Sequence, residues 1–538
     1  MAEAGAATAA AMPAGRPGWM ASPWLIAPVV ALAAFMEVLD ISIANVALNH
    51  IAGSMGASED ESTWVLTSYL VTNAIVLPIS GWLSEMFGRK RFFMTCIAGF
   101  TVTSLMCGLA PSLAMLVVFR ALQGFTGGGL QPVSQAILAD SFPPAQRGMA
   151  FAFYGLAVVF APAIGPTLGG WITDHASWRW VFLINIPVGA LVLLLASIMV
   201  HDTPAMTEAR AEKRSRKLNI DYFGFGLLAL GLGGLQVVMD KGERDDWFSS
   251  HFILALSLVV AAALVLFVVR ELKTDDPIVD LRLLKNRNFA VANVLMFMLG
   301  FVLLASTQLI PQFVQTSLGY TATQAGLVLS PGGFALILIM PIMGKLAGKV
   351  DARWLIMFGL FVSGLALLYM TNFDLQVDYK TIALARTVQA MGLAFLFIPI
   401  NVAAYVGLPR EKTNMATALV NLSRNLGGSV GISLVQTVFA RRAQYHQSVL
   451  TSDITDFNTR ANASLDQLTA YFQSLPHNAD DALQQAHAVF YGMLVQQSVM
   501  LAFIDTFKVM AVVFLAVIPV VFLMKKAAPA AAGPPGAH

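Results

Sequence analysis

Charged residues are scarce in this sequence. Only 12% of its 538 residues are Asp, Glu, Lys or Arg, whereas 57% are apolar. A soluble globular protein carries about 25% charged residues, so this chain has too little polar surface to remain in water. The composition excludes a soluble enzyme and a disordered chain. The formal net charge of +2 also gives no general attraction to nucleic acids.

Signatures of redox, metal and nucleotide chemistry are missing as well. The only two cysteines, Cys96 and Cys107, are separated along a helix by about 16 Å, which is too far for a disulfide. The sequence contains no G-x-x-x-x-G-K-[S/T] phosphate loop, no His/Cys metal-ligand spacing and no G-x-S-x-G nucleophile motif. We therefore expect no cofactor, no metal site and no enzymatic activity, and an ATP-driven pump is disfavoured.

Long apolar runs dominate the sequence instead. A helix crosses a bilayer with about 20 mostly apolar residues, and fourteen runs reach about that length. These runs are 24–48, 62–84, 92–110, 112–139, 147–172, 178–200, 220–239, 250–270, 289–315, 322–347, 354–371, 379–406, 413–440 and 501–524. We therefore expect an all-α polytopic membrane protein with fourteen transmembrane helices.

Lys and Arg gather in alternate connections between these runs. They occur at 89–91, 210–217 and 282–287, for example, whereas the first loop of the opposite set carries acidic residues at 59–61. Because cytoplasmic loops carry the excess of Lys and Arg, both termini are predicted to be cytoplasmic. The polar segment 441–500 is then predicted to face outward.

An internal repeat divides the chain into two related halves. Arg120 and Gln123 recur with the same spacing as Arg386 and Gln389, and further Pro, Met and Gly matches keep the same offset between the halves. Repeats of this kind mark the halves of many transporters. We therefore expect two six-helix bundles with an extra pair of helices between them.

The expected division of the chain follows from the runs and the repeat. It comprises a cytoplasmic tail at 1–22, an N-terminal bundle at 23–200, a cytoplasmic linker at 201–218, two extra helices with a linker at 219–288, a C-terminal bundle at 289–524 that includes the outward segment 441–500, and a cytoplasmic tail at 525–538.

Charged residues inside the apolar runs are the strongest functional signal. Asp40 lies in the first run, Glu37 lies one helical turn before it, and Arg120 lies in the fourth run. Asp40 and Arg120 are each about 12 Å from the outer face. Charges at such depth are costly and usually functional.

Burial disfavours the ionised form of a carboxyl group, so Asp40 can hold or release a proton near neutral pH. Glu37 is placed to share that proton. We predict that Arg120 pairs with ionised Asp40 and loosens when Asp40 is protonated. A purely structural Asp–Arg pair is the alternative.

A motif rich in glycine and cations lies between the second and third runs. It reads Gly81-x-Leu83-Ser84-Glu85-x-x-Gly88-Arg89-Lys90-Arg91. Gly81 and Gly88 allow a tight cytoplasmic turn, and the three cations are expected to stay at the negatively charged leaflet surface. Glu85 can pair with a cation on a neighbouring helix end and stabilise one conformation. Anchoring of the topology alone is the alternative.

The fifth run contains residues that bend helices and allow close packing. They are Pro162, Gly165, Pro166, Gly169 and Gly170. Proline removes intrahelical hydrogen bonds and glycine allows backbones to approach closely. We therefore expect this helix to bend and to pack tightly against a neighbour.

Together these motifs, with Leu39-Asp40-x-Ser42 in the first run and Arg120-x-x-Gln123-Gly124 in the fourth, resemble those of EmrB-type fourteen-span drug:proton antiporters. These antiporters belong to the major facilitator superfamily, and the resemblance covers nearly the whole chain. The sequence departs from the family pattern at Ser42, Asn49 and Glu85, where the family has Thr, Pro and Asp.

The resemblance implies a function and partners. It implies alternating-access export of hydrophobic toxic compounds against protons across a bacterial inner membrane, with the span-five motif sealing leakage. It also implies a tripartite pump with an EmrA-like periplasmic adaptor and a TolC-like outer-membrane channel. The segment 441–500 is the expected docking surface for the adaptor, with a solvated loop as the alternative. Export of a narrower substrate such as fatty acids, or proton-coupled uptake of a solute, remain alternative functions.

Further polar and aromatic residues are candidates for lining a substrate cavity between the halves. Arg424 can bind anionic groups of a substrate, or it can belong to an interhelical hydrogen-bond network. Asp505 and Lys508 are expected to form a local salt bridge. The cavity candidates are Phe35, Met36, Tyr69, Asn73, Gln123, Tyr154, Gln308, Gln312, Asn401, Tyr405 and Arg424.

Overall fold

The computed structural model describes most of the chain. The described residues are 22–143, 146–201, 221–275, 277–455, 458–475 and 479–525. All regular secondary structure in these ranges is helical. Nearly all of the predicted tails and of the linker 201–218 lies outside the described residues.

The first half is a bundle of long helices. Three of its crossings are interrupted or preceded by short helical pieces. Its elements are α1 (Pro23–Met55), α2 (Glu59–Ser62), α3 (Trp64–Phe87), α4 (Arg89–Gly108), α5 (Leu113–Gly127), α6 (Leu130–Ser141), α7 (Arg147–His175), α8 (Trp180–Leu183) and α9 (Asn185–Met199).

The extra pair and the second half follow. The first extra crossing contains a π-helical turn over its glycines. These elements are α11 (Tyr222–Leu228), η2 (Ala229–Gly233), α12 (Gly234–Lys241), η3 (Trp247–Ser249), α13 (His251–Lys273), η4 (Leu281–Lys285), α14 (Arg287–Leu318), α15 (Ala322–Leu346), α16 (Ala352–Met370), α17 (Tyr379–Ala404), η5 (Arg410–Lys412), α18 (Thr413–Ser452), α19 (Thr459–Gln473), α20 (Ala479–Ala516) and α21 (Ile518–Val521).

Thirteen spans in the described residues are long and apolar enough to cross a membrane. They correspond to thirteen of the fourteen predicted runs, so the chain is a multi-pass membrane protein. The remaining run, 413–440, forms the first part of α18. This helix carries many polar residues, but it packs inside the bundle against α3, α14 and α20. Its crossing of the bilayer therefore stays a prediction.

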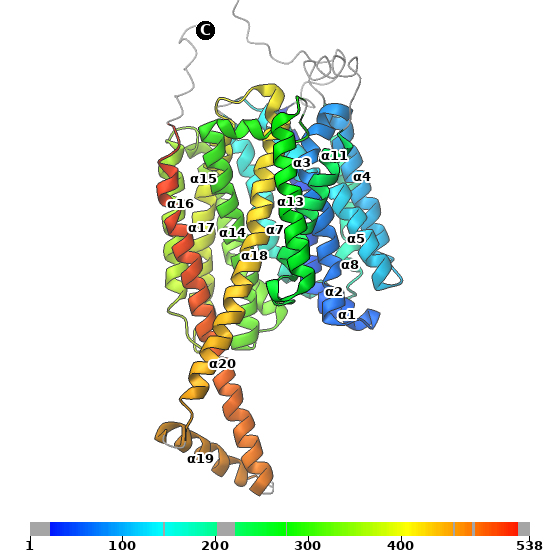
Figure 1. Cartoon of the computed structure of the whole chain (residues 1–538). Coiled ribbons are helices and arrows are strands. Elements are labelled where there is room, and N and C mark those ends of the chain that lie inside the picture. Colours follow the sequence, from blue (N-terminus) through cyan, green and yellow to red (C-terminus); the bar gives the residue numbers. More distant parts are fainter. Residues whose placement is uncertain are drawn as a thin grey trace, which may run out of the picture.

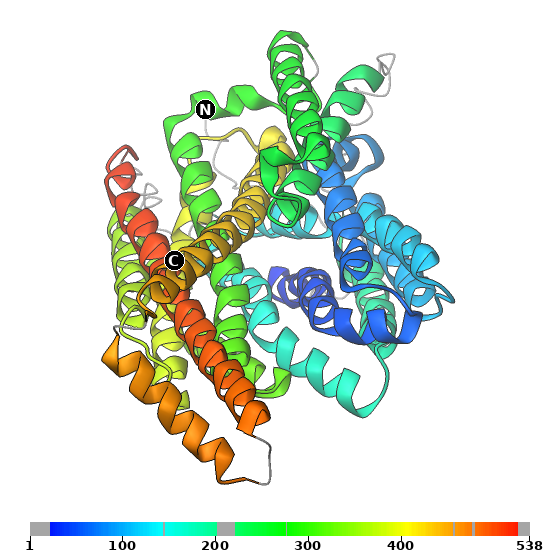
Figure 2. The ribbon, with the colours of Figure 1, turned by 60° about the horizontal axis from the view of Figure 1, so that its bottom comes forward.

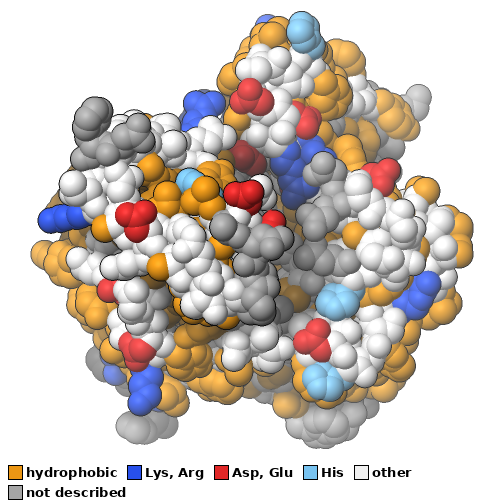
Figure 3. All heavy atoms as spheres, turned by 90° about the horizontal axis from the view of Figure 1, so that it is seen from below, with side chains coloured by type: hydrophobic (Ala, Val, Ile, Leu, Met, Phe, Trp, Pro, Cys, Tyr) orange, Lys and Arg blue, Asp and Glu red, His pale blue; other side chains and the backbone are white. Residues whose placement is uncertain are grey.

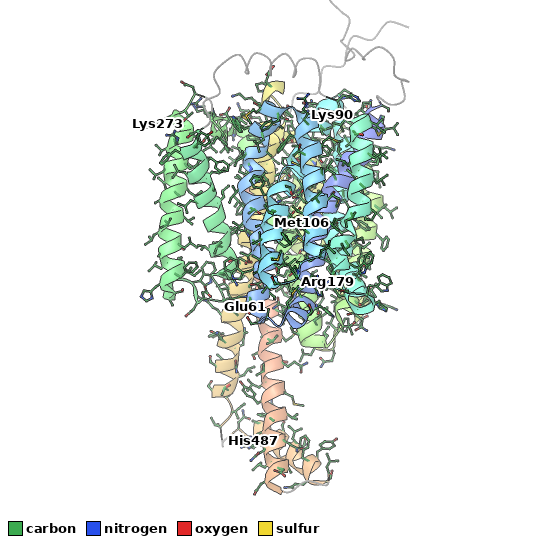
Figure 4. All side chains as sticks on the ribbon, turned by 90° about the vertical axis from the view of Figure 1, so that its right-hand side faces the viewer. Glu61, Lys90, Met106, Arg179, Lys273 and His487 are labelled. Carbon is green, nitrogen blue, oxygen red and sulfur yellow. The ribbon has the colours of Figure 1, made fainter. Side chains whose placement is uncertain are left out.

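Labelled residues identify the two ends of the bundle, and the predicted orientation in the membrane stays a prediction. Lys90 and Lys273 lie at one end, whereas Glu61 and Arg179 lie towards the other (Figure 4). His487 lies well beyond that second end. We refer to the end with Lys90 as the cytoplasmic end and to the opposite end as the outer end.

Local sequence signals set the turns between long helices. Gly319 ends α14 with φ of +71°, a left-handed conformation that favours glycine. Two residues later, the Thr321 side chain accepts from the Gln324 backbone N–H, and the Gln324 side chain accepts from the Thr321 N–H. This capping box starts α15, so the chain reverses direction within a few residues at the outer end.

The helices form two groups that face one another. In Figure 2 the blue and cyan helices of the first half lie beside the green, yellow and red helices of the second half. Contacts between the halves join α7 to α15 and α17, and join α18 to α3 and α6. The extra helix α12 touches both α3 and α18, so the extra pair contacts both halves.

Glycines allow the halves to approach closely at the cytoplasmic end. A β-carbon added to Gly81 of α3 would lie 3.0 Å from the Asn414 carbonyl oxygen of α18. One added to Gly344 of α15 would lie 2.9 Å from the Met149 α-carbon of α7. Side chains larger than hydrogen would therefore force the halves apart.

The halves also touch towards the outer end. A β-carbon added to Gly326 of α15 would lie 2.4 Å from Thr167 Oγ1 of α7. The hydroxyl oxygens of Thr167 and Ser330 are 3.4 Å apart. In this conformation α7 and α15 are therefore in contact along most of their length.

An outward extension continues α18 and α20 beyond the bundle, with α19 at its tip (Figure 1). Where these helices leave the bundle, Asp505 of α20 forms ion pairs with Arg442 at 2.5 Å and with His446 at 2.7 Å. The expected partner of Asp505 was Lys508, one turn further along the same helix. The ion pairs instead tie α20 to α18 at the base of the extension.

Disulfide cross-linking tests the outer contact between the halves. Thr167→Cys combined with Ser330→Cys should cross-link on mild oxidation, because the native hydroxyls already lie 3.4 Å apart. The measurement is a mobility shift that dithiothreitol reverses. Thr167→Cys with Ser363→Cys is the matched control, since Ser363 bonds to α17 inside the second half. Equal cross-linking of both pairs, or of neither, would contradict the packing of α7 on α15.

Candidate functional site

A buried ion pair joins the first and fourth crossings. Arg120 Nη1 of α5 lies 2.5 Å from Asp40 Oδ2 of α1, and both side chains are 0% exposed. Arg120 Nε also donates to the Val65 carbonyl oxygen at 3.1 Å. The contact that the depths of Asp40 and Arg120 predicted is therefore present. Its role in proton coupling stays a prediction.

Further donors complete the surroundings of Asp40. Asp40 Oδ1 accepts from Gln123 Nε2 at 3.1 Å and from Asn185 Nδ2 at 2.6 Å. Asn185 Nδ2 also donates to Ser104 Oγ at 3.0 Å. Asn185, the first residue of α9, was not predicted from the sequence. A lone amide in an apolar run was the only available signal.

Aromatic rings flank the guanidinium of Arg120. Its central carbon lies 4.3 Å from the ring centre of Tyr69 and 5.4 Å from that of Phe182. Such cation–π contacts stabilise a cation that has been removed from water. Tyr69, a predicted cavity-lining residue, is fully buried and packs on Arg120.

Glu37 occupies a separate position on α1. Its Oε1 accepts from Asn73 Nδ2 of α3 at 2.9 Å, and its Oε2 is buried without a hydrogen-bond partner. Among the described residues no hydrogen bond joins Glu37 to Asp40. The structure therefore gives no direct contact through which the two carboxyl groups would share a proton, and each has its own amide partners.

Polar side chains from both halves meet at the centre of the bundle. Asn421 of α18 donates to Gln135 of α6, and Gln135 donates to Asn401 of α17. Tyr154 Oη of α7 donates to Asn421 Oδ1 at 3.3 Å. All four side chains are buried. We call Gln135, Tyr154, Asn401 and Asn421 the interface network.

Arg424 lies one helical turn from this network. Its Nη2 donates to Gln131 of α6 in the opposite half, so Arg424 belongs to the interhelical hydrogen bonding that was one of its two predicted roles. Gln131 and Gln135 were not predicted, although their spacing of four residues places both on one face of α6.

The remaining cavity candidates do not gather in one place. Phe35 stacks on Phe160 with ring centres 6.5 Å apart, and Met36 is buried in the core. Tyr405 stacks on Phe151 at 5.6 Å. Gln312, further out on α14, accepts from Gln436 at 2.7 Å, and Gln308 is half-buried.

The basic motif forms a contact between the halves at the cytoplasmic end. Gly88, with φ of +92°, joins α3 to α4. Arg89 then forms an ion pair with Asp140 at 2.7 Å and donates to Asn414 Oδ1 of α18 at 2.5 Å. The expectation that Arg89 stays at the leaflet surface is wrong, because this side chain is buried.

Lys90 is half-buried, unlike Arg89. Its Nζ donates to the Ser197 carbonyl oxygen at 2.6 Å. Arg89 thus joins α4 to α18 of the other half, and the pairing expected of Glu85 stays a prediction. The close approach of α18 to Gly81 brings Asn414 within reach, and nothing in the local motif indicates that approach.

The proline- and glycine-rich motif packs α7 against α1. A β-carbon added to Gly165 would lie 2.2 Å from Ser42 Oγ, and one added to Gly169 would lie 3.1 Å from the Ile43 side chain. Pro162 and Pro166 lie inside α7, and Gly170 accepts from the Thr173 hydroxyl. The tight packing expected of this motif therefore holds the part of α1 that carries Asp40.

Known proteins resemble this chain over nearly its full length. The Major Facilitator Superfamily model matches residues 30–432. The multidrug export protein EmrB of Escherichia coli K12 is 36% identical over 510 residues, which are 95% of this chain and 96% of that protein. The fatty acid resistance protein FarB of Neisseria gonorrhoeae is 35% identical over 495 residues, 92% and 94% of the two chains.

Solved structures share the fold at low sequence identity. The human organic anion transporter MFSD10 superposes with a TM-score of 0.55 and 16% identity. The match covers 79% of this chain and 94% of MFSD10.

A double-mutant cycle tests the buried ion pair. Arg120→Gln leaves the Asp40 carboxylate without its cation, and breaking a buried pair in this way costs about 3–5 kcal/mol. Adding Asp40→Asn should recover much of that loss, because no charge then remains unpaired. The measurement is equilibrium unfolding in detergent micelles.

The matched control for this cycle is Arg270→Gln, which removes an ion pair with Asp221 whose arginine is 42% exposed. It should change stability far less, because water screens surface pairs. If Arg120→Gln is as stable as the unchanged protein, the pair does not carry the energetic role assigned to it.

Proposed function

The chain belongs to the major facilitator superfamily, and from that premise we propose that it is a proton-driven exporter of hydrophobic toxic compounds. The names of its relatives, multidrug export protein and fatty acid resistance protein, support export as the direction of transport. The observation that carries proton coupling is the fully buried Asp40–Arg120 pair.

Protonation of Asp40 changes the balance of charge inside the first half. The neutral carboxyl group no longer attracts Arg120, so the 2.5 Å contact weakens and the guanidinium relies on Gln123 and Val65. Deprotonation restores the pair. The membrane potential contributes about 2.3 kcal/mol per charge per 100 mV, which is enough to bias such an exchange.

The packing of α1 connects this change to the interface between the halves. Asp40 and Glu37 lie on one helix, and α7 is held against it through Gly165 and Gly169. The same helix α7 carries Tyr154 of the interface network. A shift of α1 on protonation would therefore be transmitted to the residues between the halves.

The interface network suits amphipathic cargo. Buried amides and a tyrosine hydroxyl lie beside aromatic surface, because Tyr154 stacks on Phe397 with ring centres 6.0 Å apart. Sites that combine apolar walls with few polar groups bind small organic molecules. Opening to the cytoplasm would break the Arg89–Asn414 hydrogen bond, and opening outward would separate α7 from α15.

A narrower substrate range is the second candidate. The likeness to a fatty acid resistance protein over 92% of this chain favours export of fatty acids. Arg424 at the interface supplies a cation that could bind the carboxylate of a fatty acid.

We further propose that the outward extension docks a periplasmic adaptor of the EmrA type, within a bacterial inner-membrane pump that also uses a TolC-like channel. No residue of α19 is buried. The extension exposes Tyr471 by 60%, Tyr491 by 56% and Met493 by 55%. Viewed from this end, acidic, basic and hydrophobic side chains are interspersed (Figure 3).

Transport by reconstituted protein tests the proton-coupling proposal. Proteoliposomes with an imposed pH gradient should accumulate a fluorescent hydrophobic cation. Addition of a protonophore should abolish this accumulation, and addition of ATP should have no effect on it. Asp40→Asn should abolish uphill transport, because the amide cannot carry the proton. Asp466→Asn, at an exposed position on α19, is the control and should transport normally. Uphill transport by correctly inserted Asp40→Asn protein at the normal rate would refute the proposal.

Replacement of the tip of the extension tests adaptor docking. A Gly/Ser linker of the same length in place of 453–478 removes α19 while keeping the Asp505 ion pairs. Transport in proteoliposomes should remain, and resistance of whole cells to toxic compounds should fall. Loss of both activities, or of neither, would rule out a docking role for α19.

A further inference from the structure

The internal repeat places a second buried arginine in the second half. Arg386 and Gln389 of α17 stand at the positions that correspond to Arg120 and Gln123. The two pairs have the same internal geometry. Arg120 Nη1 donates to Gln123 Oε1 at 2.8 Å, and Arg386 Nη1 donates to Gln389 Oε1 at 2.7 Å. The arginine–glutamine pair of the first half is therefore repeated in the second half.

The surroundings of the two pairs differ in their acidic residue. At the same offset between the halves, Ser306 of α14 corresponds to Asp40. Arg386 Nη1 donates to Ser306 Oγ at 2.8 Å, where Arg120 contacts a carboxylate. Arg386 Nη2 donates to Thr307 Oγ1 at 3.0 Å. Within the ranges that the structure describes, no acidic side chain forms an ion pair with Arg386, so no carboxylate there neutralises its buried charge.

Gln389 provides a second, independent observation. In the first half, Gln123 Nε2 donates to Asp40 Oδ1 at 3.1 Å. The corresponding Nε2 of Gln389 is fully buried and has no hydrogen-bond partner among the described residues. A buried donor without an acceptor is costly and calls for an explanation. The missing acceptor is the atom that a carboxylate at position 306 would supply.

We propose that Arg386, Gln389, Ser306 and Thr307 bind a monovalent anion where the first half holds the Asp40 carboxylate. A guanidinium and an amide N–H are the donors that complement a carboxylate or a halide. Arg386 lies about 10 Å inside the outer end of α17 and is buried, so the anion would enter from the outer side when the helices open. The anion is chloride from the medium or the carboxylate of a transported acid. This site is independent of proton coupling and of the direction of transport.

Thermal unfolding of the purified full-length protein in a neutral detergent tests the site. The two probes are sodium chloride and sodium butyrate, each replacing the salt of a bulky sulfonate at constant ionic strength. The unchanged protein should show a saturable rise in its unfolding midpoint with one or both probes, because a ligand that binds only the folded state stabilises it. A shift with chloride alone indicates a halide site. Competition between butyrate and chloride indicates a carboxylate site.

Two substitutions at one position provide the matched comparison. Ser306→Asp fills the site with the protein's own carboxylate, so the midpoint in sulfonate should rise and the response to both probes should disappear. The Asn side chain of Ser306→Asn has nearly the same size as that of Asp but carries no charge, so this variant should keep the response of the unfolding midpoint to the anions. Arg386→Gln removes the cation without adding an acid, and it should also abolish the response. Absence of any anion response in the unchanged protein, or a full response in Ser306→Asp, would overturn the proposal.

Discussion

A charge in a membrane interior has to be neutralised where it stands, and in this protein that constraint organises the first half. Asp40 and Arg120 neutralise each other at 2.5 Å, and among the described residues Arg120 Nη2 has no hydrogen-bond partner. Gln123 and Asn185 supply further donors to the carboxylate, and Tyr69 covers the guanidinium. Because separating buried charges is costly, the pair ties α1 to α5.

A related constraint applies to the neutral polar side chains at the interface between the halves. Buried amides must be hydrogen-bonded, and the interface network satisfies them across α6, α17 and α18. Each hydrogen bond across the interface opposes opening, so alternation requires replacement of these bonds by water or by cargo. The glycine contacts at Gly81, Gly326 and Gly344 oppose opening less. They bring the backbones of the two halves together without strong hydrogen bonds, so the helices can separate there at low cost.

Much of this architecture could be predicted from the sequence. Apolar runs identified thirteen spans that the structure confirms, and equal depth in the bilayer predicted the contact of Asp40 with Arg120. The family resemblance is confirmed as well. The failures share one cause. Burial of Arg89 follows from the approach of α18, which lies in the other half of the sequence, and Asn185 reaches Asp40 only through the packing of α9 on α1. Periodicity indicates that a residue lies on a helix face, but it does not identify the neighbour of that face. The cavity candidates were therefore scattered over several faces.

The proposed antiport requires that binding of cargo and protonation of a buried carboxyl group on α1, Asp40 or Glu37, exclude one another. Proton release by the purified protein, followed with a pH-sensitive dye in weakly buffered detergent solution, measures this directly. Addition of a transported hydrophobic compound should release protons from the unchanged protein, and the release should vanish when Asp40 and Glu37 are both replaced by their amides. Binding of the compound without proton release, or equal release from the doubly substituted protein, would contradict the account.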